Sequence, residues 1–288
     1  MADKKKNWLF YALITMVTWG IWGAFSSTPD YPATLTYVVW AISMIPCALL
    51  ALNNIHWKLD IRPKSVALSL GVGLLGAAGQ LILFEALQHG PAYIIFPVIS
   101  CASVLTVILS AVFLKERVRP LGILGILFAF AAIICFSLTP SDGTVASGYL
   151  WLVLALSVFV CWGIQAFIMK LANNHTPDAE SVFVYMAIAA VLLIPVALLM
   201  TDFSQPVNWK FNGPYLTFII QILNAIGAYT LVYANRHGKA MVVAPLVDAL
   251  APLMTVIISL ILYRHMPPAV QIAGIVCGLS GVFILSRE

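Results

Sequence analysis

The chain has 288 residues, of which 62% are hydrophobic and only 9% are charged, and its mean hydropathy is +0.99. Soluble globular domains carry about 25% charged residues, so this composition excludes a soluble protein and indicates that lipid is the main solvent. The formal net charge of +4 does not by itself indicate an anionic partner, because the basic residues are placed along the chain in a pattern that has a simpler explanation.

Ten apolar runs follow one another, separated by short polar connections. A helix that crosses a bilayer needs about 20 residues and satisfies its backbone hydrogen bonds internally, whereas the strands of a membrane barrel alternate apolar and polar residues. The runs here are continuous, so they predict helices. The predicted membrane-spanning helices are 8–27, 32–53, 65–87, 91–114, 120–138, 147–169, 179–200, 213–235, 240–262 and 268–286. We therefore expect an all-α fold, a polytopic membrane protein of ten transmembrane helices.

The first run, 8–27, follows Lys4-Lys5-Lys6 and resembles a signal peptide, in which a basic segment precedes an apolar one. The run is longer than the apolar core of a signal peptide, which spans about 7–15 residues. Its Trp-Gly-Ile motif also recurs later in the chain. We interpret the run as a retained helix.

The distribution of lysine and arginine predicts the orientation. If the N-terminus is cytoplasmic, 13 of the 15 basic residues fall in cytoplasmic segments, and only Lys210 and Arg264 fall outside. Short cytoplasmic loops of membrane proteins are enriched in these residues, so both termini are predicted to be cytoplasmic and the protein to lie in the cell (cytoplasmic) membrane. The positive charge is then an orientation signal, and no nucleic-acid partner is expected.

The second half of the chain repeats motifs of the first half. His89-Gly90-x-Ala92-x4-Pro97 recurs as His237-Gly238-x-Ala240-x4-Pro245 at an offset of 148, Thr106-Val107-Ile108-x-Ser110 recurs as Thr255-Val256-Ile257-x-Ser259 at an offset of 149, and Trp19-Gly20-Ile21 recurs as Trp162-Gly163-Ile164 at an offset of 143. These matches divide the chain into two units, 1–139 and 140–288, with five predicted helices each. Because five is odd, the second unit is expected to be inverted relative to the first.

Inverted repeats are typical of alternating-access transporters, whose substrate site lies near the midplane between the repeats. We therefore predict a secondary transporter that moves a small polar or amphipathic organic metabolite, with proton coupling and exchange both open. The alternatives are a channel-like facilitator and a membrane receptor or scaffold without transport. No motif of a nucleophile with its base occurs, and the five cysteines have no metal-binding spacing, so no enzyme, metal or cofactor is expected. The oligomeric state is not predicted.

The residues also resemble a known family, the EamA branch of the drug/metabolite transporter superfamily. The resemblance covers the whole chain and is carried by Pro97-Val-Ile-Ser100, Glu116, Gly125, Gly274 and Gly278. It implies a ten-helix carrier for metabolites, amino acids, nucleotide sugars or drugs. The chain departs from the pattern at Arg264-His265, where the second unit lacks a counterpart of Glu116.

Two carboxylates, Glu85 and Asp248, lie inside predicted spans. A charge at the centre of a bilayer costs at least about 2.5–3.5 kcal/mol, so each needs a partner, a cavity or a proton. Asp248 stands between Pro245 and Pro252, and Pro252 leaves the carbonyl of Asp248 without its helical donor, which predicts an interrupted, polar stretch of helix. Both carboxylates are candidates for proton coupling. Asp248 could instead form a buried hydrogen bond to a neighbouring helix, for instance to Gln221 or Asn224. Glu85 could instead pair with His89, four residues on.

Aromatic and amide residues in the middle of the spans complete the set of candidates. The residues predicted to contact a substrate are Trp19, Trp22, Gln80, Ser100, Trp162, Gln165, Gln221, Asn224, Tyr229 and Asp248. Tryptophan faces beside a carboxylate suit a cationic or zwitterionic amine, and they equally suit stacking on an aromatic ring. For Trp19 and Trp162 the alternatives are that they face lipid or pack between helices.

Overall fold

A computed structural model describes residues 7–113, 120–137, 148–238, 240–263 and 268–285, and within these ranges all regular structure is helical. The helices are α1 (Asn7–Phe25), α2 (Ala33–Asn54), α3 (Pro63–His89), α4 (Ala92–Ser100), α5 (Ala102–Phe113), α6 (Pro120–Ser137), α7 (Leu150–His175), α8 (Ala179–Leu192), α9 (Ile194–Met200), α10 (Leu216–His237), α11 (Ala240–Tyr263) and α12 (Ala269–Leu285), with a π-helical turn, η1 (Phe211–Tyr215), before α10. The predicted all-α class is therefore confirmed.

Seven helical segments are long and apolar enough to cross a membrane, counted over the described residues only. They correspond to α1, α2, α3, the pair α4 and α5, α7, the pair α8 and α9, and η1 with α10. Large apolar side chains are exposed on the outer surfaces of these helices, for example Leu199, which is 88% exposed, and Phe113. Such a surface is stable in lipid, so the chain is a multi-pass membrane protein. The number of ten membrane-spanning helices stays a prediction.

Two of the predicted spans contain a break. The range 91–114 holds α4 and α5, which meet at Cys101, and the range 179–200 holds α8 and α9, which meet at Leu193. Pro195 explains the second break, because it has no N–H for the carbonyl of Val191 and its ring crowds that carbonyl. The interruption that we predicted around Asp248 is not seen, since α11 runs as one helix from Ala240 to Tyr263.

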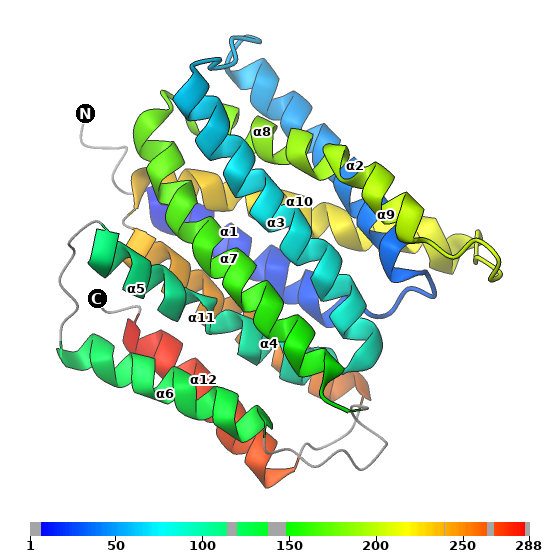
Figure 1. Ribbon diagram of the computed structural model, residues 1–288, viewed down its shortest axis with the longest axis vertical. Helices are drawn as coiled ribbons and strands as arrows, with labels where there is room; N and C mark the ends of the chain where they lie inside the picture. Colours follow the sequence, from blue (N-terminus) through cyan, green and yellow to red (C-terminus); the bar gives the residue numbers. More distant parts are fainter. Residues whose placement is uncertain (1–6, 114–119, 138–147, 239, 264–267, 286–288) are drawn as a thin grey trace.

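The helices pack in pairs that join the two halves of the chain. Helix α3 packs along α7, α1 packs along both α10 and α11, and α6 packs along α12. The pair α6 and α12 forms one edge of the bundle, while α2, α8 and α9 lie at the opposite edge (Figure 1). The start of α1 and the end of α12 lie on the same side of the bundle (Figure 1). We call the side on which α1 begins the N-terminal face.

Basic side chains stabilise helix ends at the N-terminal face. Arg62 forms an ion pair with Asp60 at 2.8 Å and donates to the carbonyl of His175, at the end of α7, at 2.6 Å. Arg236 donates to the carbonyls of Asn173 and Thr176 in the same region. Cations at helix C-termini are favourable because the unpaired carbonyls there carry partial negative charge. The hydrogen bonds from Arg62 lower the pKa of the Asp60 carboxyl to about 2.

Candidate functional site

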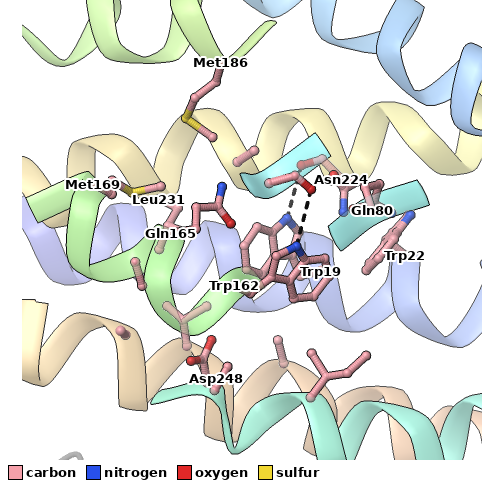
Figure 2. A pocket seen from close by; sticks show the side chains of 18 of the residues that line it. Trp19, Trp22, Gln80, Trp162, Gln165, Met169, Met186, Asn224, Leu231 and Asp248 are labelled. Carbon is pink, nitrogen blue, oxygen red and sulfur yellow. Dashed lines mark hydrogen bonds between the residues drawn. The ribbon is translucent and has the colours of Figure 1, made fainter. Parts of the chain in front are cut away.

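A cavity of about 120 Å³ lies inside the bundle and is lined by residues from both halves of the chain. Helices α1, α2, α3, α4 and α5 line it from the first half, and α7, α8, α10 and α11 line it from the second. Met186 of α8 and Asp248 of α11 approach it from opposite sides (Figure 2). A water molecule needs about 10–15 Å³ measured in this way, so the cavity has room for a small organic solute.

The indoles of Trp19 and Trp162 are held in the cavity wall by equivalent hydrogen bonds. The Nε1 of Trp19 donates to the carbonyl of Asn224 at 3.1 Å, and the Nε1 of Trp162 donates to the carbonyl of Gly76 at 3.4 Å. Gly76 and Asn224 are separated by 148 residues, the offset of the sequence repeat. The two halves therefore hold their tryptophans in the same way, each against a helix of the other half.

Two glycines make room for these indoles. A Cβ atom at Gly79 would lie 2.4 Å from the Nε1 of Trp162, and a Cβ atom at Gly227 would lie 2.3 Å from the Nε1 of Trp19. Gly79 and Gly227 are also 148 residues apart. Because the Nε1 edge of each indole packs against a helix backbone, it is the remaining ring surface that borders the cavity.

The repeated Gly and Thr residues contact each other across the halves. Thr106 Oγ1 donates to the carbonyl of Gly163 at 2.9 Å, and Thr255 Oγ1 donates to the carbonyl of Gly20 at 3.1 Å. A Cβ atom at Gly20 would lie 2.6 Å from the Cβ of Met254. The absence of a side chain thus lets α1 approach α11 closely, and α7 approaches α5 in the same way.

Two further tryptophans complete the aromatic wall. Trp22 is buried, donates through Nε1 to Gln221 Oε1 at 2.8 Å and packs edge-on against Phe96. Trp40 donates through Nε1 to Asn224 Oδ1 at 2.7 Å. Gln221 does not line the cavity itself, so its contribution is to fix the position of Trp22.

The polar residues of the cavity differ in whether their side-chain groups have hydrogen-bond partners within the protein. The hydroxyl of Ser100 donates to the carbonyl of Pro97 at 2.7 Å. Gln80 is only 2% exposed, and its Nε2 has no hydrogen-bond partner among the described residues. Asp248 is partly exposed because it lines the cavity, where Gln165 also lies. Burying an amide donor without a partner is unfavourable, so Gln80 is a position where a ligand would add a missing interaction.

Two predicted candidates lie away from the cavity. Glu85 is on the surface, with its side chain 49% exposed, and pairs with His89 at 3.0 Å. Tyr229 belongs to a hydrogen-bonded chain in which Asn54 donates to Tyr229 and Tyr233 donates to Glu180 Oε1 at 2.5 Å, with the two tyrosine hydroxyls 3.1 Å apart. The other predicted residues except Gln221, namely Trp19, Trp22, Gln80, Ser100, Trp162, Gln165, Asn224 and Asp248, all line the cavity.

Sequence reasoning missed Trp40, Phe96 and Asn235, which also line the cavity. Trp40 and Phe96 lie within predicted spans, away from the span ends where tryptophan is usual. This location could have identified them as candidate cavity residues. Among the described residues, no group of three His, Cys, Asp or Glu side chains is placed to hold a metal ion. The described residues of the cavity wall offer one carboxylate, several amides and four indoles, a set that suits reversible binding of an organic molecule.

Comparisons with known proteins agree with this architecture. The sequence model of the EamA-like transporter family matches residues 6–138 and again residues 149–287. The pseudopaline exporter CntI of Pseudomonas aeruginosa is 24% identical over 287 residues, which cover 100% of this chain and 98% of that protein. A probable terminal-alkyne amino-acid exporter of Streptantibioticus cattleyicolor is 28% identical, over 96% of this chain and 92% of its own length.

One further sequence match covers about half of the chain, and one solved structure matches its fold. An uncharacterized protein of Methanocaldococcus jannaschii is 26% identical over 135 residues, which are 47% of this chain and 95% of that protein. A solved crystal structure aligns with a TM-score of 0.68 and 18% identity over 98% of both chains. At that identity the structural match shows a shared fold and nothing about the substrate.

Proposed function

This chain belongs to the EamA-like transporter family, and we propose that it is a secondary transporter that moves a small polar or amphipathic organic metabolite across the cytoplasmic membrane by alternating access. The observation that carries the proposal is the cavity, which lies inside the bundle and is built from both halves of the chain. A site between repeats that can be opened to either side is what alternating access requires.

The proposal includes ten membrane-spanning helices in two inverted units, 1–139 and 140–288. The helix contacts support it, because a contact between two helices recurs between the equivalent helices when each helix is replaced by its counterpart in the other unit. Helix α3 packs on α7 as α10 packs on α1, and α3 packs on α8 as α10 packs on α2. The paired tryptophan and threonine hydrogen bonds obey the same exchange. Two separate matches to one family, each over one half of the chain, also support it.

We further propose that the N-terminal face is cytoplasmic, as the basic residues predict, and that the transporter exports its substrate. The direction rests on the two full-length relatives that are named as exporters. Asp248 is the carboxylate that could couple transport to protons, since it lines the cavity whereas Glu85 does not.

Reconstitution in proteoliposomes tests the proposal. Vesicles loaded with an unlabelled metabolite that stabilises the purified protein should accumulate the labelled form transiently, and the initial rate should saturate with concentration. A channel-like facilitator would give flux without counterflow, and a receptor or scaffold would bind without any flux. Either result would refute the transporter proposal.

The contribution of the cavity is tested by comparing two carboxylate variants in the same assay. Asp248→Asn should abolish or strongly change counterflow, while Glu85→Gln should leave it close to the wild-type rate, because Glu85 is outside the cavity. Equal rates for the wild type and Asp248→Asn would remove Asp248 from the transport site.

A further inference from the structure

The four indole N–H groups around the cavity are already used by the protein. Trp19 and Trp162 donate to backbone carbonyls, and Trp22 and Trp40 donate to side-chain amide oxygens. A solute in the cavity therefore meets aromatic carbon surface and no free indole donor. Indole faces carry negative potential and attract cations, organic ammonium groups above all.

Other polar groups in the cavity wall also have hydrogen-bond partners within the protein. The hydroxyl of Thr255 donates to the carbonyl of Gly20, and the amide nitrogen of Asn235 donates to the carbonyl of Leu231. With Ser100 bonded to Pro97, the hydroxyl and amide donors of these residues are turned away from a solute. This leaves few groups that can recognise one.

Two of the remaining groups have opposite hydrogen-bonding character. The carboxylate of Asp248 makes no hydrogen bond or ion pair with any described residue, and no lysine, arginine or histidine occurs among the described residues that line the cavity. The amide nitrogen of Gln80 is a donor without an acceptor among the described residues. A carboxylate inside a helix bundle without a counter-charge is costly, so the cavity lacks a cation for Asp248 and an acceptor for Gln80.

We propose that the transported solute is an organic ammonium compound that also carries a carboxylate or carbonyl group. Asp248 accepts hydrogen bonds from the ammonium group, the faces of Trp19 and Trp162 border the same cation, and Gln80 Nε2 donates to the carboxylate or carbonyl oxygen. This inference rests on the proposed function, because it assigns the substrate of the same cavity. A zwitterion satisfies both unpaired groups at once, whereas a neutral aromatic solute leaves Asp248 without a counter-charge.

Matched ligand sets test the inference on the purified full-length protein in lipid nanodiscs. Each set holds one side chain constant and changes the charged groups: L-phenylalanine, phenethylamine and 3-phenylpropionate form one set, and L-leucine, isoamylamine and 4-methylpentanoate form another, with corresponding sets for the methyl and indole side chains. Binding is measured by isothermal titration. We expect the zwitterion to bind most tightly within a set, the amine more weakly, and the carboxylate without amine at least tenfold more weakly than the zwitterion.

Variants test separately the contribution of Asp248, which binds the ammonium group, and that of Gln80, which binds the carboxylate or carbonyl oxygen. Asp248→Asn should weaken both the zwitterion and the amine at least tenfold, which is about 1.4 kcal/mol, and Asp248→Glu should restore part of the affinity. Gln80→Leu should weaken the zwitterion several-fold and leave the amine unchanged, because the amine has no group for Gln80 to bind. Glu85→Gln removes a carboxylate of the same helix bundle outside the cavity and is the matched control. Size-exclusion chromatography of each variant establishes that it is folded.

The outcomes separate this inference from the proposed function. Tightest binding of an anionic or neutral compound, equal affinity in Asp248→Asn, or failure of every ammonium compound in all four sets would each overturn the inference. Saturable counterflow of a solute without an ammonium group would retain the transporter and refute the substrate class. Binding through Asp248 without counterflow would support the ligand class and refute transport.

Discussion

The contact between Gly79 and Trp162 gives a prediction whose size follows from the structure. In Gly79→Ala the new Cβ would lie 2.4 Å from Nε1 and 2.6 Å from Cδ1 of the Trp162 indole. Ordinary contacts are about 3.5–4.0 Å, so the indole must move by about 1 Å. The hydrogen bond from Trp162 to the carbonyl of Gly76 is already 3.4 Å long, and a displacement of this size breaks it.

The cost is the sum of three contributions. Overpacking of a close contact costs about 1–3 kcal/mol, and loss of the hydrogen bond costs about 0.5–1.5 kcal/mol. Alanine is favoured over glycine in a helix by about 1 kcal/mol, which offsets part of the loss. The free energy of unfolding should therefore fall by about 0.5–3.5 kcal/mol, and the melting temperature by about 1–14 °C at roughly 2–4 °C per kcal/mol.

The assay is thermal unfolding of the purified protein in nanodiscs, with Gly71→Ala as the control on the same helix. No atom lies within 4 Å of the Cβ that would be added at Gly71, so this variant should be as stable as the wild type or slightly more stable. Gly227→Ala should reproduce the effect of Gly79→Ala, since its Cβ would meet Trp19 at 2.3 Å. If Gly79→Ala had the same melting temperature as Gly71→Ala, the close packing of α3 on α7 would be refuted.

Three further predictions concern the threonine contacts between the halves, the tyrosine network and the ion pair of Asp60. Thr106→Val and Thr255→Val each remove one hydrogen bond between halves, so each should lower the free energy of unfolding by about 0.5–1.5 kcal/mol, and denaturant titration should give similar values for the two if the halves are equivalent. Tyr233→Phe removes the donor to Glu180 and should change the counterflow rate more than the affinity; an unchanged rate would assign the network to stability alone. Asp60→Asn should lower the melting temperature at neutral pH, because it removes the ion pair that lowers the pKa of Asp60 to about 2. The stabilisation by this pair is present above the unfolded pKa of about 3.9 and is lost as the pH falls toward 2. The difference in melting temperature between the wild type and Asp60→Asn should therefore shrink between pH 5 and pH 3.

The hydropathy of the chain predicted the helical ranges closely because a bilayer imposes helix length and apolarity directly. It could not predict the breaks inside a range. Pro195 stops α8 at Leu192, whereas α11 continues through Pro245 and Pro252 as one helix. A proline weakens a helix locally, but the neighbouring helices decide whether the axis breaks, and those contacts are not written in the local sequence.

For the site, mid-span polar and aromatic residues were a good guide when the repeat supported them. Trp19 and Trp162 occupy equivalent positions in the cavity wall. Depth alone was a weaker guide. Tyr229 lies outside the cavity, and Glu85 is exposed beside His89. Depth along a helix can be read from a sequence, whereas the direction in which a side chain points around that helix depends on its packing partners.

The repeat and the cavity separate two kinds of residue. Three pairs that keep the same residue in both halves make contacts between helices: Gly20 with Gly163, Gly79 with Gly227 and Thr106 with Thr255. The same contacts occur in both halves, so the packing is preserved when the halves exchange roles, as the proposed alternating-access cycle requires.

Two pairs that differ, in contrast, contribute the polar side chains Gln80 and Asp248 to the cavity wall. Ser100 aligns with Asp248 at the offset that aligns Pro97 with Pro245, and Gln80 aligns with Ala228 at the same offset. One pair places an amide in the first half and the other places a carboxylate in the second, and neither group has a counterpart of the same kind in the other half. The two groups that need a ligand therefore come from different halves, Gln80 from the first and Asp248 from the second. A solute bound to both would bridge the halves, and its binding energy would depend on how they are arranged. The symmetric residues can then set the two conformations, while the asymmetric residues determine which solute shifts the equilibrium between them.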